Sequence, residues 1–310
     1  DWSSDVCSSD LNIKNPPLVA LTLEELLLKE IPKRNNLLTP WLPSQGLCML
    51  YSTRGLGKTW MALAIAHAVA SNDSFLSWET GSAEGVLYID GEIPMTVMQE
   101  RLAQIVGSTS KEIIAPFSII TPDAQEYGIP DLSTIDGQER VEKLITDETK
   151  LIVMDNISTL SRTGKENEGE SWLPLQEWGL RLRSRGKTVL FIHHSGKDGQ
   201  QRGTSRREDV MDTVISLKKP ADYKQQDGAS FEVHFEKNRG LYGDDVNPFE
   251  VRLTSNTSVE GNKKFVWTWK SLEASTFEKV CSLKNEGMTQ SEIAEELDIN
   301  KSTVSRYVNR

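Results

Sequence analysis

A glycine-bearing loop between two apolar segments constrains the fold of this chain more than any other feature. The loop covers residues 52–59 and reads Ser-Thr-Arg-Gly-Leu-Gly-Lys-Thr; it follows the apolar run 47–51 and precedes the apolar segment 60–70. Glycines let backbone N–H groups converge on an anion, and the start of a helix attracts negative charge. The segment therefore predicts a strand, a phosphate-binding loop and a helix.

The loop matches the Walker A pattern, except that Ser52 stands where the pattern has its first glycine. In this pattern Lys58 neutralises phosphate oxygens, and the hydroxyl of Thr59 binds the magnesium ion that accompanies ATP. The alternative, a glycine-rich turn without a ligand, does not account for the strand and helix on either side. The expected ATP contacts are Ser52, Thr53, Arg54, Gly55, Leu56, Gly57, Lys58, Thr59 and Trp60.

Apolar strands and amphipathic helices alternate along most of the chain, which predicts an α/β fold with a mostly parallel sheet covered on both faces. Four later strands alternate at period two and follow one another without long helices, so we expect them to extend the sheet as antiparallel hairpins. The expected helices are 60–70, 95–106, 135–145 and 172–185, after a short capped helix within 21–31. The expected strands are 47–51, 85–90, 117–121, 151–155 and 188–193, then 213–217, 230–237, 249–254 and 264–270.

Two acidic residues follow predicted strands and suggest catalytic chemistry. Asp155 ends the apolar run 151–155, as a Walker B aspartate does when it orients magnesium through water. The next residue is Asn156, so the base that activates water must lie elsewhere, and Glu92 after the strand 85–90 is the expected base. In the alternative, Asp90 is the base and Glu92 caps the next helix.

His193 and His194 end the predicted strand 188–193. A histidine at the carboxyl edge of such a strand can sense the γ-phosphate through a hydrogen bond, and we expect His194 to do so. The alternative is that both are ordinary core or edge residues with satisfied hydrogen bonds.

The segment 288–308 has the pattern of a helix-turn-helix. Ile293, Ala294 and Leu297 lie on one face of its first helix, and Val304 and Val308 lie on one face of the second. Duplex DNA would then meet the outward residues Ser302, Thr303 and Arg306. The alternative use of such a module is protein contact. We expect a polar linker near Ser271 and a separate small all-α domain over 271–310.

Composition limits the other possibilities. The net charge of −10 means that nucleic acid would have to bind local clusters of Lys and Arg. No run approaches the about 18 to 20 apolar residues of a membrane span, and the three cysteines lack paired spacing, so we expect a cytoplasmic protein. Residues 1–11 resemble a translated sequencing adapter, and we exclude them from the fold.

Several motifs in order resemble the hexameric RepA-like helicases of the RecA/DnaB-type superfamily of P-loop ATPases. The resemblance covers about 21–270 and implies a RecA-like P-loop domain over 12–270. The motifs are PWLPSQGLCMLYSTRGLGKT, VLYIDGEIP, LIVMDN, HHSGK, QRGTSRRED and FEKNRG. It also implies a homo-hexameric ring in which Lys237 and Arg239 of FEKNRG reach the ATP of a neighbouring subunit. The alternative for these two residues is a solvated hairpin end.

The resemblance further implies that a loop over 196–209 enters the central channel and binds single-stranded DNA. Its basic residues are Lys197, Arg202, Arg206 and Arg207, and the alternative is an ordinary mobile surface loop. The leading hypothesis is a DNA-dependent ATPase, a ring-forming helicase or translocase of a plasmid or phage-like element. The rival is an ATP-responsive DNA-binding regulator or loader. A small-molecule kinase would leave FEKNRG and the helix-turn-helix unexplained.

Overall fold

The computed structural model describes most of the chain. The described residues are 18–31, 33–162, 172–195, 208–220, 223–224, 228–257 and 263–309. Residues 1–11 and the four basic residues expected to bind single-stranded DNA, Lys197, Arg202, Arg206 and Arg207, lie outside these ranges. By its internal contacts the chain divides into two units, Asp1–Lys33 and Arg34–Arg310.

The first unit contains the capped helix expected within 21–31, now bounded as α1 (Leu23–Leu28). The Thr22 hydroxyl accepts the Glu25 N–H at 3.2 Å, and the Glu25 carboxylate accepts the Thr22 N–H at 2.7 Å. This capping box satisfies two backbone donors that a helix start leaves free. In α1, every residue of which the structure describes, no side chain is buried.

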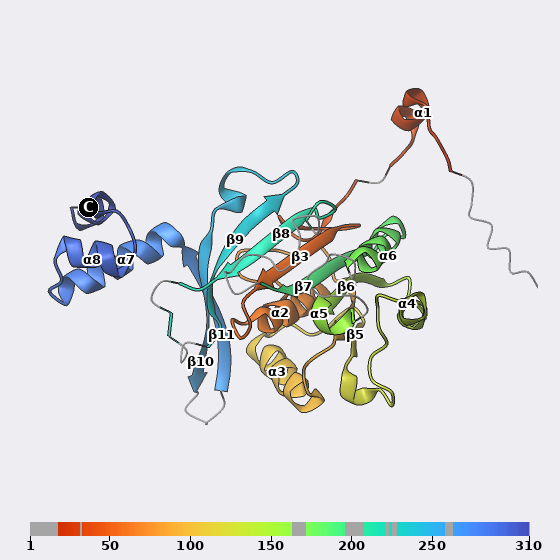
Figure 1. Ribbon diagram of the computed structural model, residues 1–310, viewed down its shortest axis with the longest axis horizontal. Coiled ribbons are helices and arrows are strands. Elements are labelled where there is room, and N and C mark those ends of the chain that lie inside the picture. Colours follow the sequence, from red (N-terminus) through yellow and green to blue (C-terminus); the bar gives the residue numbers. More distant parts are fainter. Residues whose placement is uncertain are drawn as a thin grey trace, which may run out of the picture. The chain divides into compact units, whose positions relative to one another are not determined.

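The second unit is built on a nine-stranded sheet with the order β11-β10-β9-β8-β3-β7-β6-β4-β5 (Figure 1). Its parallel part matches the expected strands: β3 (Leu47–Ser52), β4 (Gly85–Asp90), β5 (Phe117–Ile120), β6 (Thr149–Asp155) and β7 (Thr188–His194). Every residue of β3, β4 and β7 is buried, because helices cover both faces of a parallel sheet.

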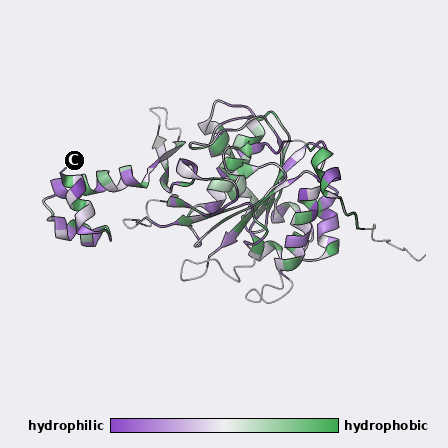
Figure 2. Ribbon diagram, turned by 90° about the horizontal axis from the view of Figure 1, so that it is seen from above, coloured by the Kyte–Doolittle hydropathy of each residue, from purple (hydrophilic) through white to green (hydrophobic). Residues whose placement is uncertain are grey.

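Alternate residues of β3 reach two separate hydrophobic cores. Cys48 and Leu50 pack on one face with α2 (Lys58–Ser71) and α3 (Met95–Ser108). Leu47 and Met49 pack on the other face with α4 (Ile135–Glu142), α5 (Ile157–Leu160) and α6 (Trp172–Ser184). Figure 2 shows that most helices carry both hydrophobic and hydrophilic residues, as expected of helices that cover a sheet with one face.

The remaining strands of the sheet are β8 (Thr213–Lys218), β9 (Ser230–Asn238), β10 (Phe249–Thr257) and β11 (Lys263–Ser271). The last three pair antiparallel as expected. β8 also pairs antiparallel with β9, as expected, and it joins the parallel part of the sheet by pairing parallel with β3. The segment between His194 and Thr213 is long enough to return the chain to the amino-terminal edge of the sheet, which a parallel neighbour requires.

Short elements that the sequence pattern did not predict complete the second unit. A two-stranded sheet joins β1 (Asn36–Leu38) and β2 (Leu42–Pro43), and α5 is also new. Two 3₁₀ turns are η1 (Pro122–Ala124) and η4 (Gly243–Val246). Such short segments have too few residues for a periodic pattern to stand out.

Three helices at the end of the chain share their own core: α7 (Leu272–Asn285), α8 (Gln290–Glu296) and α9 (Lys301–Val308). Ile293, Leu297 and Val304 are buried there, and so is Tyr307, which the sequence pattern missed. The expected polar linker is absent between β11 and α7, both of which the structure describes. Ser271 ends the strand and caps the helix, accepting the Ala274 N–H at 3.2 Å.

The helix α7 is tied to the sheet by the buried carboxylate of Glu250 on β10. Lys279 of α7 lies 3.1 Å from this carboxylate, Arg252 lies 2.6 Å from it, and the Ser275 hydroxyl donates a hydrogen bond to it. These contacts hold the pKa of Glu250 down to about 2, against the opposing effect of burial.

None of the described helices is long and apolar enough to span a membrane.

Candidate active site

Two glycines shape the loop between β3 and α2. Gly55 and Gly57 have φ values of 79° and 111°, which residues with a side chain rarely adopt. A Cβ on Gly57 would also lie 2.8 Å from the Cβ of Ala229. The loop conformation therefore depends on glycine at these positions. At Gly57, the nearby residue Ala229 also leaves no space for a side chain.

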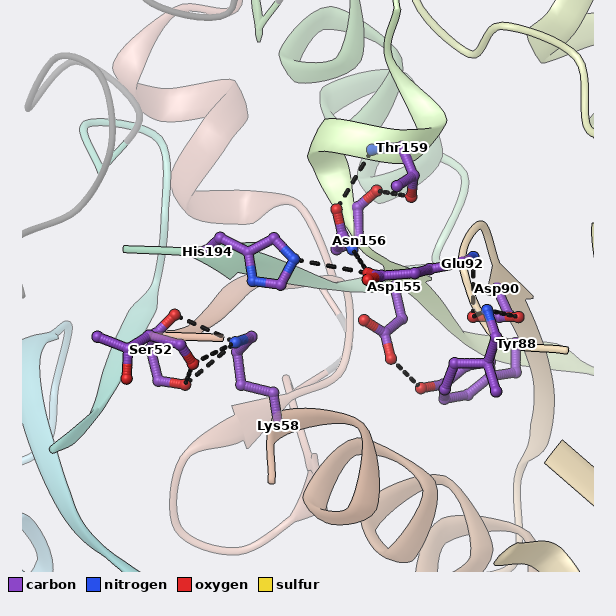
Figure 3. A network of polar contacts seen from close by, with 11 residues as sticks. Ser52, Lys58, Tyr88, Asp90, Glu92, Asp155, Asn156, Thr159 and His194 are labelled. Carbon is purple, nitrogen blue, oxygen red and sulfur yellow. Dashed lines mark hydrogen bonds and ion pairs between the residues drawn. The ribbon is translucent and has the colours of Figure 1, made fainter. Parts of the chain in front are cut away.

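The ammonium group of Lys58 binds the strand end that precedes the loop (Figure 3). Its Nζ donates to the Ser52 carbonyl at 3.1 Å, the Ser52 hydroxyl at 3.2 Å and the Thr53 carbonyl at 2.9 Å. Burial lowers the pKa of Lys58 to about 8, and the charges of Asp155 and Glu92 oppose this decrease. Ser52, the one departure from the Walker A pattern, thus supplies an additional oxygen to the lysine.

Asp155 ends β6 with 4% of its surface exposed. The Tyr88 hydroxyl donates to its Oδ2 at 2.7 Å, and a second hydrogen bond comes from the side chain of Thr59. Burial raises the pKa of Asp155, while the two hydrogen bonds and the charge of Lys58 act in the opposite direction. The sequence pattern predicted Asp155 and Thr59 as neighbours but missed Tyr88.

Glu92 lies in the turn after β4, with 54% of its side chain exposed. Its Oε2 accepts a hydrogen bond of 2.6 Å from the side-chain amide of Asn156 and lies 3.6 Å from Nε2 of His194 (Figure 3). Gly91 allows this turn to lie close to α5, because a Cβ there would be 2.4 Å from the Thr159 hydroxyl. The turn thus carries the Glu92 carboxylate toward Asn156 and His194.

Asp90 has a different environment from Glu92. Its carboxylate is fully buried and accepts the backbone N–H of Glu92 at 3.3 Å and that of Ile93 at 3.0 Å. Burial, and then the nearby charge of Asp155, raise the pKa of Asp90 to about 7. Asp90 therefore stabilises the turn that follows β4 and does not cap α3, whereas the Glu92 side chain reaches into the cavity described next.

One cavity of about 460 Å³ lies above the phosphate loop. Six of the nine expected ATP contacts line it, whereas Ser52, Thr53 and Leu56 do not, and Leu56 packs into the hydrophobic core. Its lining also includes Ile93 and Pro94, which end the VLYIDGEIP motif. The sequence patterns did not single out the further lining residues Val97, Arg101, Gly228 and Ala229. The Arg101 guanidinium lies 5.3 Å from the ring centroid of Trp60. No local motif marks Val97, Arg101, Gly228 and Ala229, because they come from two distant segments, α3 and the residues before β9.

His194 also lines this cavity, at the end of β7. Burial and the charge of Lys58 lower the pKa of His194 to about 4, despite the nearby Glu92, so the imidazole is neutral at neutral pH. His193 is buried in β7 and is not among the described residues of the cavity lining.

Lys237 and Arg239 lie at and beyond the end of β9. Lys237 donates to the carbonyls of Glu208 and Asp209, and Arg239 donates to the Asp209 carbonyl at 2.7 Å. Neither is included among the described residues that line the cavity around Lys58. Both cations are therefore held together at one turn, outside the cavity of their own chain.

The oxygen ligands of the cavity suit magnesium only together with a phosphate. Magnesium prefers oxygen donors, and Thr59 and Asp155 provide a hydroxyl and a carboxylate at the cavity floor. Within the described ranges, no group of three or more His, Cys, Asp or Glu side chains could hold a metal ion. Phosphate and water oxygens would have to complete the coordination shell, as is usual for a nucleotide-bound magnesium ion.

The expected DNA contacts on α9 differ in exposure. Ser302 and Arg306 are exposed and Thr303 is partly exposed, while Val304 and Tyr307 face the helical core. The Arg306 guanidinium lies 5.1 Å from the ring centroid of Tyr307. One face of α9 therefore packs on α7 and α8, and the residues expected to meet DNA are on the solvent side.

Two family models match the two parts of the chain described above. A family model described as a winged helix-turn-helix DNA-binding domain matches residues 283–310. Among solved structures, a KaiC-like protein from Pyrococcus horikoshii OT3 is similar over 74% of this chain and 94% of its own, with 15% identity and a TM-score of 0.48. No curated protein matches the sequence. A family model described as an AAA domain matches residues 14–200, more than half of the chain, and the chain therefore belongs to the AAA domain family of P-loop ATPases.

Proposed function

We propose that this protein is a DNA-dependent ATPase that hydrolyses ATP in the cavity above Lys58. The observation that carries the proposal is the position of the Glu92 carboxylate. It extends into the cavity that contains Lys58, Thr59 and Asp155, and the amide of Asn156 holds it at 2.6 Å. A carboxylate held close to a phosphate-binding loop is suited to take a proton from an attacking water.

Each residue of the cavity has a distinct role in this proposal. Lys58 neutralises the β- and γ-phosphate oxygens, and its contacts with Ser52 and Thr53 exchange for contacts with phosphate. Thr59 and Asp155 would hold a magnesium ion, which would neutralise charge on the phosphates when bound. Glu92 accepts the proton of water, while Asn156 orients its carboxylate.

His194 acts as the sensor of the γ-phosphate in this scheme. His194 lines the same cavity as Lys58 and Glu92, and its Nε2 lies 3.6 Å from the Glu92 carboxylate. Because its pKa is lowered to about 4, the neutral ring can change hydrogen-bond partner without carrying a charge into the site. This supports a sensor that couples phosphate binding to the position of Glu92.

We further propose that Lys237 and Arg239 act on the ATP of a neighbouring subunit in a homo-hexameric ring. Their contacts with the carbonyls of Glu208 and Asp209 keep both cations on one turn, away from their own cavity. A cation supplied by a neighbour stabilises charge on the γ-phosphate only in the assembled ring. This arrangement would make hydrolysis depend on assembly.

Two kinds of DNA contact complete the proposal. The exposed face of α9, with Ser302, Thr303 and Arg306, would meet duplex DNA. Single-stranded DNA would pass the loop over 196–209 in the channel of the ring. The proposed biological role is that of a ring-forming helicase or translocase of a plasmid or phage-like element in the cytoplasm.

The second candidate function is an ATP-responsive DNA-binding regulator or loader that does not unwind DNA. It is favoured by the direct attachment of the helix-turn-helix to the ATPase sheet through Glu250, Ser275 and Lys279. In that case the nucleotide state would change DNA binding through α7 without strand separation.

A strand-displacement assay with forked DNA, run beside an ATPase assay, separates the two candidates. The helicase proposal expects displacement that requires ATP and is lost in Lys58→Ala. ATP hydrolysis stimulated by DNA without displacement of any fork would favour the regulator or loader. A rate of ATP hydrolysis that does not change when DNA is added would contradict both candidate functions.

A further inference from the structure

Tyr88 lies within β4, beside the strand that ends in Asp155. The two strands pair parallel, with Tyr88 opposite Val153 and Asp90 opposite Asp155. Alternate residues of a strand share one face of the sheet, so Val153 and Asp155 lie on the same face, and Tyr88 lies on it too. The Tyr88 hydroxyl therefore reaches Asp155 diagonally, one pair further along the two strands.

The ring of Tyr88 is held by the residues around it. It is fully buried, in the same hydrophobic core as Met61 of α2 and Met98 of α3. Side chains in a close-packed core keep one conformation, because neighbouring atoms leave no space for another. The hydroxyl is therefore a hydrogen-bond donor at a fixed point, and it does not move with the group that it binds.

This fixed donor binds one oxygen of the Asp155 carboxylate. The Tyr88 hydroxyl donates to Oδ2 at 2.7 Å, and the Thr59 side chain makes a further hydrogen bond to the carboxylate (Figure 3). The terminal torsion of an aspartate is otherwise broad, and hydrogen bonds to a charged acceptor are stronger than those between neutral groups. The bond from Tyr88 thus restricts how the carboxylate of Asp155 can turn.

The turn after β4 binds the same part of β6. The Gly91 N–H donates to the backbone carbonyl of Asp155 at 2.7 Å. The Glu92 carboxylate accepts the side-chain amide of Asn156 at 2.6 Å. These two contacts and the one from Tyr88 join the end of β4 to the end of β6. They set the position of the Asp155 carboxylate relative to that of Glu92.

We propose that Tyr88 is a positioning residue for the divalent cation that accompanies ATP, because its hydroxyl holds the Asp155 carboxylate in the orientation that the cation requires. This inference rests on the proposed function, in which Thr59 and Asp155 would hold magnesium. Magnesium tolerates little departure from octahedral geometry, so a carboxylate that turns freely would bind the ion or its water less well. Loss of a hydrogen bond to a metal-binding side chain typically lowers metal affinity by about 10- to 100-fold.

Tyr88→Phe removes the hydroxyl and keeps the ring. Equilibrium binding of a fluorescent, non-hydrolysable ATP analogue to the full chain is measured while the Mg²⁺ concentration is varied. We expect the half-saturating Mg²⁺ concentration to rise about tenfold in Tyr88→Phe, whereas binding of the analogue in excess EDTA should not change. This measurement reports on the cation without any turnover. An unchanged Mg²⁺ requirement would overturn the proposal.

Tyr51→Phe is the matched control. Tyr51 is also a buried tyrosine of the sheet, on β3, but its hydroxyl makes a hydrogen bond with the side chain of Ser216. We expect this variant to keep the Mg²⁺ requirement of the unaltered chain. An equal rise in both variants would indicate a general effect of losing a buried hydroxyl and would overturn the role of Tyr88.

A third variant separates positioning from stability. Placing 4-aminophenylalanine at position 88 keeps the ring and a hydrogen-bond donor, and it should restore most of the Mg²⁺ affinity that Tyr88→Phe loses. Thermal unfolding reports whether each variant is folded. If Tyr88→Phe does not fold, or if the amino group restores nothing, the hydroxyl serves stability and the proposal is overturned.

The unaltered chain distinguishes failure of this inference from failure of the proposed function. If its binding of the ATP analogue does not respond to Mg²⁺ at all, the proposed function fails. If it responds to Mg²⁺ and Tyr88→Phe responds in the same way, only the role of Tyr88 fails.

Discussion

The side-chain amide of Asn156 donates a 2.6 Å hydrogen bond to the carboxylate of Glu92, which lies 64 residues earlier in the chain. Asn156 follows Asp155 directly and also caps α5, accepting the Thr159 N–H at 3.2 Å. One residue therefore connects the end of β6, the start of α5 and the proposed catalytic carboxylate. In the proposed mechanism, Asn156 follows the aspartate that would hold magnesium and orients the base instead of serving as the base.

Replacing Asn156 with Ala should lower kcat by about tenfold while ATP affinity stays the same, because a hydrogen bond to a charged group is lost. Rapid-quench and equilibrium-binding measurements separate the two quantities. Asn247→Ala is the matched control, since that exposed amide bonds to Asp244. A large loss of ATP affinity in Asn156→Ala would mean that the residue acts in binding.

Arg239→Ala should bind ATP normally but lose hydrolysis, and mixing it with Lys58→Ala should restore partial activity. In a mixed ring, some interfaces pair an intact phosphate loop with an intact arginine. The ATPase rate is measured across mixing ratios after subunit exchange has been confirmed by energy transfer between labels. If no ratio restores activity, the arginine does not act across a subunit boundary.

Stability should fall at acid pH because of Glu250. Its pKa in the folded protein is lowered from 4.5 to about 2, so its stabilising contribution is present above pH 4.5 and is lost as the pH falls toward 2. In urea unfolding at pH 6, Glu250→Gln should be less stable than the unaltered chain. The difference in stability between the two should shrink near pH 3. A difference that is constant with pH would argue against this carboxylate as the titrating group.

Arg306→Glu should weaken duplex DNA binding by at least about tenfold, because it reverses a charge on the exposed face of α9. Lys284→Glu on α7 makes the same change in charge at another exposed position and is the matched control. Affinities are compared at two salt concentrations, since phosphate contacts weaken as salt rises. Equal losses in both variants would indicate a general charge effect and not contact through α9.

The parts of the site that follow strand ends were predictable from sequence. Lys58, Asp155, Glu92 and His194 each follow an apolar run, and parallel strands bring their carboxyl ends to one edge of the sheet. The spacing within each local segment was therefore enough to place them together.

Contacts between distant segments were not predictable in this way. The sequence pattern predicts Tyr88 only as part of a strand, yet its hydroxyl donates a hydrogen bond to Asp155 on the neighbouring strand. Arg101 reaches Trp60 from a different helix, and β8 pairs parallel with β3, a strand far from it in the sequence. These features depend on which strands are neighbours, and a single sequence contains only indirect information about that order.

The rate of ATP hydrolysis by the full chain, with and without single-stranded DNA, tests the central proposal most directly when measured beside Glu92→Gln and Asp90→Asn. The account predicts that single-stranded DNA raises the rate, and that Glu92→Gln lowers it by about 10² or more while ATP still binds. Asp90→Asn should retain more activity, because the Asp90 carboxylate already accepts two backbone N–H groups of the turn and the proposal assigns the base to Glu92. A rate that does not respond to DNA, or a loss confined to Asp90→Asn, would contradict the account.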